Sequence, residues 1–120
     1  MFVKSTLLLS LLACLSLSFP CLAADEEIKP ATGQEVAFTN KLGNCLACHA
    51  IPNDPKVKSP GNIGPALIGI KARYPDRAKL RAQIWDATAT NPKTSMPPFG
   101  KNKILTEAEI DMVTDYIYGM

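Results

Sequence analysis

The sequence has little of what many catalytic and nucleic-acid-binding sites are built from. Its 120 residues include one histidine and 7% aromatic residues, and its formal net charge is +2. It has no basic run with interleaved aromatic residues, so the pattern typical of nucleic-acid binding is missing. Alternation of apolar and polar residues, which predicts half-buried strands, is almost absent. These absences favour an all-α protein whose chemistry does not come from a histidine-based catalytic cluster.

Cysteine is scarce as well, and two of the four cysteines lie in a segment that we expect to be removed. Residues 1–24 combine one cation (Lys4), an apolar run and small residues ahead of an acidic stretch, which is typical of a cleaved secretory signal peptide. The apolar run is short for a membrane span, but a retained anchor helix and lipidation of Cys14 stay open. We expect residues 25–31 to form an extended arm and residues 32–120 to form the folded domain.

The other two cysteines belong to the most informative stretch of the chain, Cys45-Leu46-Ala47-Cys48-His49. This C-x-x-C-H pattern is the attachment signature of a c-type haem. The two thiols can add to the two vinyl groups of one porphyrin, and the histidine can then ligate the iron. Two other uses of the cysteines stay open: zinc would need a fourth ligand, and a thioredoxin-type redox pair would need a βαβ context. We predict one covalently attached haem c in an exported, periplasmic protein.

With no second histidine in the chain, methionine is the common ligand for the other side of the iron. Met120 is expected to fray at the chain end, and Met112 sits in a helical pattern that suits ordinary core packing. Met96 lies in a loop, residues 91–100, that three prolines make stiff. We therefore predict His49 and Met96 as the axial ligands. A filled coordination sphere suits electron transfer, while a haem enzyme or gas sensor with a displaceable methionine stays open.

Helical patterns and caps divide the expected domain. Two capping boxes, Thr32–Glu35 and Thr106–Glu109, predict where the first and last helices begin, and the first is expected to reach about Leu42. Two middle helices are expected over residues 66–73 and 76–89, after a proline-rich loop over residues 50–65. The inward-facing candidates are Val36, Ala37, Leu42, Leu80, Ile84, Ala87, Ile110, Val113 and Ile117.

This order of elements resembles a class I cytochrome c, over about residues 32–120. In that family the first and last helices cross, and both pack around one covalently bound haem. A proline carbonyl from a Gly-Pro pair after the haem motif usually accepts a hydrogen bond from the ligating histidine. The resemblance implies this role for Pro65, preceded by Gly64, toward His49.

The resemblance has one departure, at the first helix. The family usually has an aromatic residue about four positions before the first haem cysteine, and this chain has Lys41 there. Phe38 stands three positions earlier. We therefore expect the helix crossing to be built differently, with an extra turn between the helix and the haem motif.

Five segments that occur in order narrow the resemblance to SoxX, the small monohaem subunit of the SoxAX cytochrome of bacterial sulfur oxidation. They are residues 43–49, 61–65, 73–75, 91–100 and 104–106. In that family SoxAX joins thiosulfate oxidatively to a cysteine of the carrier SoxYZ. The resemblance implies a heterodimer with a SoxA-like cytochrome of one or two haems, which would hold the catalytic cysteine. This chain would then relay electrons to a soluble cytochrome, without a catalytic residue of its own.

A free-standing periplasmic monohaem electron carrier is the alternative. For either function, five lysines of the basic stretch between residues 56 and 103 are expected around the haem edge, where they would steer acidic partners. They are Lys56, Lys58, Lys93, Lys101 and Lys103. Ordinary solvated lysines are the other interpretation.

Overall fold

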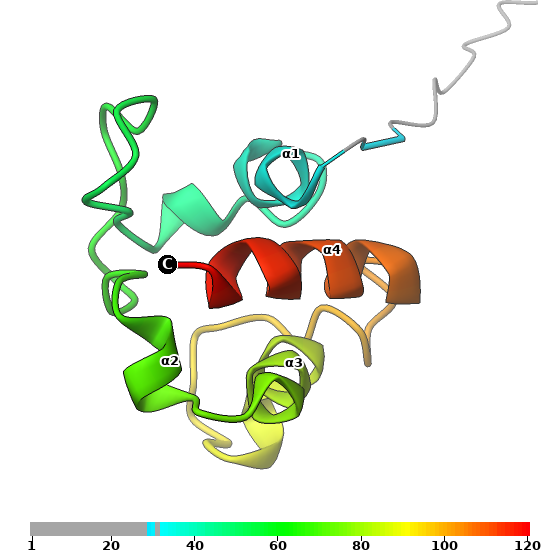
Figure 1. Ribbon diagram of the computed structural model, residues 1–120. Coiled ribbons are helices and arrows are strands. Elements are labelled where there is room, and N and C mark those ends of the chain that lie inside the picture. Colours follow the sequence, from blue (N-terminus) through cyan, green and yellow to red (C-terminus); the bar gives the residue numbers. More distant parts are fainter. Residues whose placement is uncertain (1–28, 31) are drawn as a thin grey trace, which may run out of the picture.

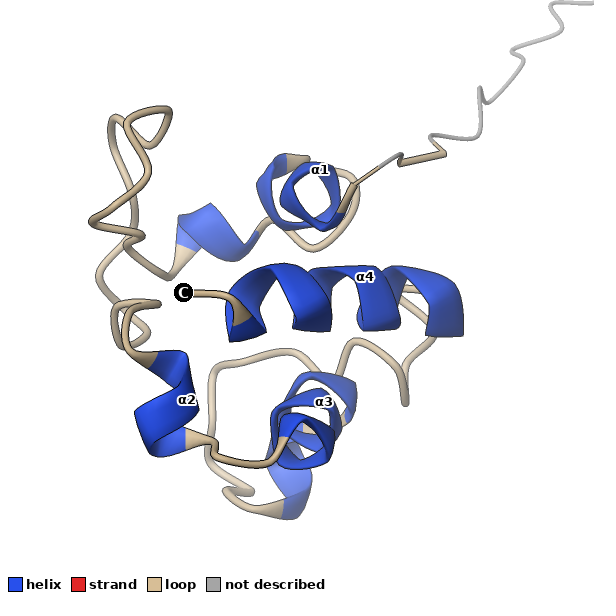
Figure 2. Ribbon diagram, viewed as in Figure 1, coloured by secondary structure: helices blue, strands red, loops and turns tan. Residues whose placement is uncertain are grey.

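The computed structural model describes residues 29–30 and 32–120. The expected signal peptide, Cys14 and most of the expected N-terminal arm lie outside these described residues. Within them, all regular structure is helical, as Figure 2 shows, which confirms the all-α prediction. The elements are α1 (Gly33–Phe38), η1 (Cys45–Ala47), α2 (Ile70–Arg73), α3 (Arg77–Trp85), η2 (Ala87–Ala89) and α4 (Glu107–Tyr118). None of the described helices is both long enough and apolar enough to span a membrane.

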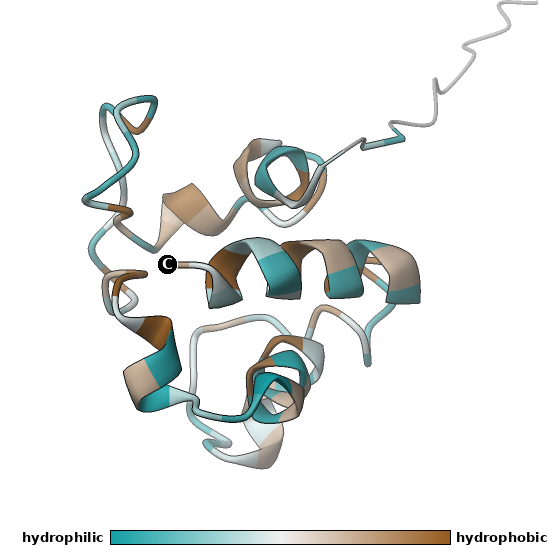
Figure 3. Ribbon diagram, viewed as in Figure 1, coloured by the Kyte–Doolittle hydropathy of each residue, from teal (hydrophilic) through white to brown (hydrophobic). Residues whose placement is uncertain are grey.

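Helix α4 is the centre of the fold and lies between α1 and α3 (Figure 1). Apolar stretches alternate with polar ones along it (Figure 3), and its buried side chains Ile110, Val113 and Ile117 are at most 4% exposed. Thr114 is also fully buried, and its hydroxyl donates to the Ile110 carbonyl over 2.6 Å. The predicted inward face of the last helix is therefore confirmed.

Helices α1 and α4 cross at Gly33. A Cβ atom at this position would overlap the carbonyl oxygen of Met112, so the backbones approach as closely as only glycine allows. One turn further along, the rings of Phe38 and Tyr116 meet edge to face, with centroids 6.2 Å apart. Aromatic pairs of this geometry are favourable. Phe38 thus provides the aromatic contact of the crossing from its shifted position in the sequence.

Helix α1 begins at its predicted capping box but ends earlier than predicted. Thr32 caps the Glu35 N–H, and the Glu35 carboxylate accepts from the Thr32 N–H in return. The helix stops at Phe38 rather than near Leu42, because Thr39 is extended and residues 40–43 form a turn. The Gly43 N–H closes that turn on the Val36 carbonyl, 2.9 Å away. The extra turn between helix and haem motif is thereby confirmed.

The two middle helices are shorter than their sequence patterns suggest. Helix α2 begins at Ile70 rather than residue 66, because Gly69 adopts a left-handed backbone with φ of 59° that interrupts the helix. Helix α3 ends at Trp85 rather than residue 89. Asp86 leaves the helical conformation there, and its carboxylate caps the Thr88 N–H to start η2. The predicted inward residues Leu80, Ile84 and Ala87 are nevertheless all buried.

Helices α3 and α4 are joined by a ladder of ion pairs. Arg81 pairs with Asp111 at 2.7 Å and with Glu107 one turn earlier. Arg77 pairs with Asp115 and, more loosely, with Asp111 at 3.7 Å. The pairs lie at the surface, where each contributes modestly, but together they fix how the two helices align.

The chain end is held rather than frayed. The Met120 carbonyl accepts a hydrogen bond of 3.0 Å from the N–H of Ile70, the first residue of α2. The expectation of a frayed Met120 is therefore wrong. The contact joins the end of α4 to the short helix α2.

Candidate haem site

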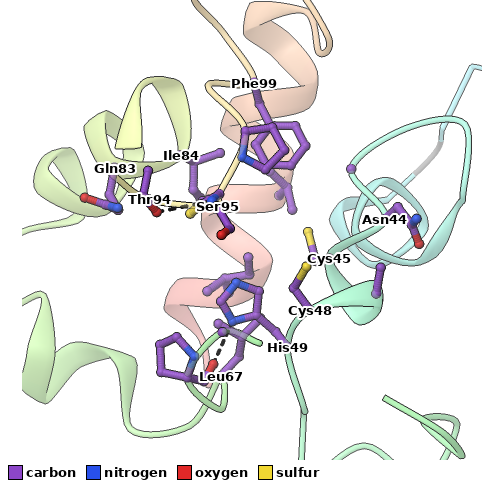
Figure 4. Close-up of a pocket in the computed structure, with 18 of the residues that line it drawn as sticks. Asn44, Cys45, Cys48, His49, Leu67, Gln83, Ile84, Thr94, Ser95 and Phe99 are labelled. Atoms are coloured by element: carbon purple, nitrogen blue, oxygen red, sulfur yellow. Dashed lines mark hydrogen bonds between the residues drawn. The ribbon is translucent and has the colours of Figure 1, made fainter. Parts of the chain in front are cut away.

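The loops around α4 leave a cavity of about 610 Å³. Ligand and cofactor cavities in proteins commonly measure roughly 300–1,000 Å³. Figure 4 shows Cys45, Cys48 and His49 across the cavity from Thr94 and Ser95 of the Met96 loop (residues 91–100). The walls between them are largely apolar and include Leu67, Ile70, Leu80, Ile84, Phe99, Leu105, Val113 and Ile117. A flat apolar cofactor with polar edges suits such a space.

The His49 ring is oriented by a backbone carbonyl. Its Nδ1 atom lies 2.6 Å from the Pro65 carbonyl oxygen, the contact expected from the sequence. Because a carbonyl oxygen only accepts hydrogen bonds, this contact places the imidazole proton on Nδ1. The lone pair of the neutral ring is then on Nε2, which is the usual arrangement for a metal-ligating histidine.

Gly64 supports the same ring from its face. A Cβ atom at this position would overlap Cε1 of His49, so the backbone of residue 64 rests directly on the imidazole. The Gly64 N–H also donates to the Cys48 carbonyl over 2.8 Å. The glycine of the Gly-Pro pair thus has a packing role that the sequence alone did not reveal.

The proline-rich loop that carries this Gly-Pro pair is fastened to the α1–α4 crossing. The Asp54 carboxylate accepts from the Gln34 side-chain amide at 2.7 Å and from the Tyr116 hydroxyl at 3.1 Å. The backbone N–H of Lys56, followed by the hydrogen bonds from Tyr116 and Gln34, lowers the pKa of Asp54. One helix crossing therefore fixes the loop that orients His49.

A tight turn places both thiols beside the histidine. Asn44 has a left-handed backbone with φ of 45°, and the η1 turn that follows carries Cys45. The Cys45 carbonyl accepts from the N–H groups of Cys48 and His49, at 3.1 and 2.9 Å. Both thiols are free and line the cavity. Burial raises the pKa of the Cys45 thiol to about 11, so this thiol is neutral at pH 7.

The methionines of the described residues differ in whether they line the cavity. Met96 lines it, whereas Met112 and Met120 do not. Met112 instead lies at the α1 crossing, with its carbonyl beneath Gly33. The Met96 N–H donates to the Thr94 hydroxyl at 3.1 Å, which shapes the loop around this residue. The two side chains predicted as axial ligands, His49 and Met96, therefore share one cavity.

The five lysines expected around the haem edge differ in their contacts. Among them, Lys93 lines the cavity. Lys56 instead donates to the Gln34 side chain at 3.0 Å, and Lys101 pairs with Asp86 at 2.9 Å. Neither of these two partners lines the cavity. That these lysines lie on the haem-edge side stays a prediction.

The residues present fit a haem c. Two neighbouring thiols, an imidazole with its Nε2 lone pair available and a thioether from the opposite loop line one largely apolar cavity. Over residues 29–30 and 32–120, no three His, Cys, Asp or Glu side chains gather as a bare metal site requires. The imidazole and thioether donors are those that an iron already bound by a porphyrin ring would need.

Comparison with known proteins defines the class. Residues 29–117 match the family described as "Cytochrome C oxidase, cbb3-type, subunit III", and the chain belongs to this family. Its fold is that of a class I cytochrome c, and it is a haem-c-binding electron-transfer protein.

Two individual proteins are similar to this chain. A chain in the crystal structure of SoxXA from P. pantotrophus shares 32% identity with a TM-score of 0.64, over 71% of this chain and 76% of that one. An "Uncharacterized lipoprotein" of Aquifex aeolicus (strain VF5) is 34% identical over 79 residues, which are 66% of this chain. The match takes up 37% of that relative's length.

Proposed function

We propose that this chain is the electron-relay subunit of a SoxAX-type cytochrome that conjugates thiosulfate to a carrier protein. The observation that carries the proposal is the shared cavity of His49 and Met96, in a fold that matches a chain of the SoxXA structure. In this function the chain passes on single electrons and makes no bond to the sulfur substrate.

One haem c would be held by four residues of the cavity. Cys45 and Cys48 would bind it through thioether bonds, and His49 and Met96 would ligate its iron. The bound haem supplies reversible one-electron chemistry, and a methionine paired with a histidine raises the reduction potential. The Pro65 carbonyl keeps the His49 proton on Nδ1 and so keeps Nε2 facing the cavity.

The apolar walls of the cavity serve the same function. Residues such as Leu80, Ile84 and Phe99 are at most 8% exposed and line it, so they limit access of water to the iron. If His49 and Met96 both ligate the iron, it would have no position for oxygen or peroxide. The arrangement favours transfer of electrons over activation of a small molecule.

The partners follow from the same proposal. A larger, SoxA-like cytochrome with the catalytic cysteine would form a heterodimer with this chain, and SoxYZ would be reached through that complex. A soluble cytochrome would accept the electrons. Support comes from the crystal structure of SoxXA from P. pantotrophus, one chain of which has this fold. Haem attachment outside the cytoplasm agrees with export by a signal peptide at residues 1–24 and with a periplasmic location.

The test is partner dependence. We expect tagged chain from the periplasm of its native host to co-purify with a second, larger haem-stained polypeptide. Addition of thiosulfate together with SoxYZ should then reduce its haem, and thiosulfate alone should not. A chain that purifies alone, and whose haem is not reduced by thiosulfate with SoxYZ and a SoxA-like subunit, would instead be a free-standing electron carrier.

A further inference from the structure

The segment from Asp86 to Lys101, which contains the Met96 loop, begins and ends at the same place in the fold. The last residue of the loop, Gly100, donates its N–H to the Trp85 carbonyl over 3.1 Å, and the N–H of Lys101 donates to the same oxygen over 3.3 Å. The Lys101 ammonium also lies 2.9 Å from the carboxylate of Asp86, the residue after α3. We call these four residues, Trp85, Asp86, Gly100 and Lys101, the loop neck. Compact loops whose ends meet in this way behave as units.

An aromatic contact closes the neck on one side. A Cβ atom at position 100 would overlap the six-membered ring of Trp85, so the Gly100 backbone lies flat against the indole. The guanidinium of Arg81 lies over the same side chain, 5.8 Å from the ring centroid. Trp85 is therefore held by a residue of its own helix, and its ring supports the backbone of Gly100.

An ion pair closes the neck on the other side. The Asp86 side chain is 15% exposed, which is well buried for a carboxylate, while that of Lys101 is 59% exposed. The N–H of Thr88 donates to Asp86 at 3.0 Å, and the Thr88 hydroxyl donates to the same oxygen. The hydroxyl, followed by Lys101, lowers the pKa of Asp86. The Asp86 carboxylate is thus fixed by Thr88 on one oxygen and by Lys101 on the other.

Beyond the neck, the loop has few polar attachments. In the described part of the chain, the hydrogen bonds of residues 92–98 stay within residues 91–102. Met96 itself donates to Thr94, two residues away. The placement of its side chain against the cavity therefore depends on apolar packing and on the neck.

We propose that Asp86 and Lys101 are positioning residues for Met96: the neck holds the loop so that the thioether stays in the cavity opposite His49. This inference rests on the proposed ligation of the iron by Met96. An opened neck would let the loop move away as a unit, while the contacts of His49 with Gly64 and Pro65 stay in place. The neck would thereby set how often the methionine side of the iron becomes free.

The experiment uses the oxidised holoprotein and imidazole as a probe ligand. Imidazole can bind only when the thioether has left the iron, so its affinity measures loop opening. Lys101→Met should raise the affinity for imidazole about five-fold. This is the upper end of the effect expected when a partly exposed ion pair is lost. Asp86→Asn, which keeps an oxygen to accept from Thr88, should have a similar effect. Lys101→Arg keeps the charge and should bind imidazole within about two-fold of the wild type.

Asp115→Asn is the matched control. It breaks the Arg77 ion pair between α3 and α4, away from the neck, and should leave imidazole affinity unchanged even if it lowers the melting temperature. The neck has no positioning role if Lys101→Met and Asp86→Asn both bind imidazole like the wild type. A Met96→Ala variant with the imidazole affinity of the wild type would contradict the proposed ligation of the iron by Met96. The positioning role of the neck would then be contradicted as well.

Discussion

At the scale of single residues, two adjacent backbone positions hold the histidine of the haem motif. Gly64 lies on the His49 ring, where any Cβ atom would overlap it, and Pro65 offers its carbonyl to Nδ1 at 2.6 Å. The two positions fix the face and the tautomer of one imidazole. The C-x-x-C-H motif supplies the ligand, but this Gly-Pro pair decides which nitrogen can reach the cavity.

The first prediction concerns Met96. A thioether bound to ferric low-spin iron gives a weak charge-transfer band near the red end of the visible spectrum. Met96→Ala should abolish this band, lower the reduction potential and open the iron to added ligands. The haem should stay attached, because Cys45 and Cys48 are unchanged. Optical spectra and redox titration of the purified variant provide the measurement.

Met112→Ala is the control for this variant. Met112 does not line the cavity, so its replacement should leave the band intact and affect stability alone. The assignment is wrong if Met96→Ala keeps the band while Met112→Ala loses it.

Short sequence patterns predict four residues that the structure places around one cavity. Cys45, Cys48 and His49 follow from their spacing, and Met96 follows from elimination and its stiff loop. The Asp86–Lys101 pair joins residues 15 positions apart, and no local pattern announces it. Contacts of this kind exist only after the loop has closed, so the sequence alone could not show them.

The starts of α1 and α4 were easier to predict than the ends of α1 and α3. The boxes at Thr32 and Thr106 are local, since each needs only a residue three positions later, and both form as predicted. The ends of α1 and α3 depend on tertiary contacts instead. Helix α3 stops where Asp86 turns to Thr88 and Lys101, and a regular apolar pattern that runs on through Ala87 conceals this stop.

The second prediction concerns the ladder between α3 and α4. Arg81 is the main cause that lowers the pKa of Asp111 in the folded protein. An unfolded aspartate titrates near ~3.9. A lowered folded pKa means that the pair stabilises the fold fully above that value, and that this stabilisation is lost as the pH falls through the lower folded pKa.

Asp111→Asn should therefore melt at a lower temperature than the wild type at pH 7. Between pH 5 and strongly acidic pH, its melting temperature should fall less steeply, because one titrating ion pair is gone. Thermal unfolding followed by circular dichroism measures both effects. Identical pH profiles for the two proteins would show that the ladder adds nothing to stability.

The whole molecule is built around a space that its own side chains do not fill. A cavity of about 610 Å³ in so small a domain is large. Without a cofactor, the largely apolar walls of this cavity would be exposed to water, which is unfavourable. The haem is therefore expected to act as part of the core.

The third prediction tests this dependence. The double variant Cys45→Ser and Cys48→Ser cannot attach haem covalently, and we expect it to lose the cofactor on purification. It should show weaker helical circular dichroism and no cooperative thermal transition. Cys45→Ser alone keeps one thioether and the axial ligands, and should retain haem and fold. A haem-free double variant that melts as cooperatively as the holoprotein would show that the chain fills its own core.

Trp85, at the neck of the Met96 loop, has a further consequence for how this protein can be studied. It is the single tryptophan of the sequence, and its ring touches the backbone of Gly100. Indole fluorescence depends on the surroundings of the ring and on nearby groups that quench it. The emission of the unlabelled protein therefore comes from one defined point in the fold. Stopped-flow fluorescence could time the opening of the loop without any added dye.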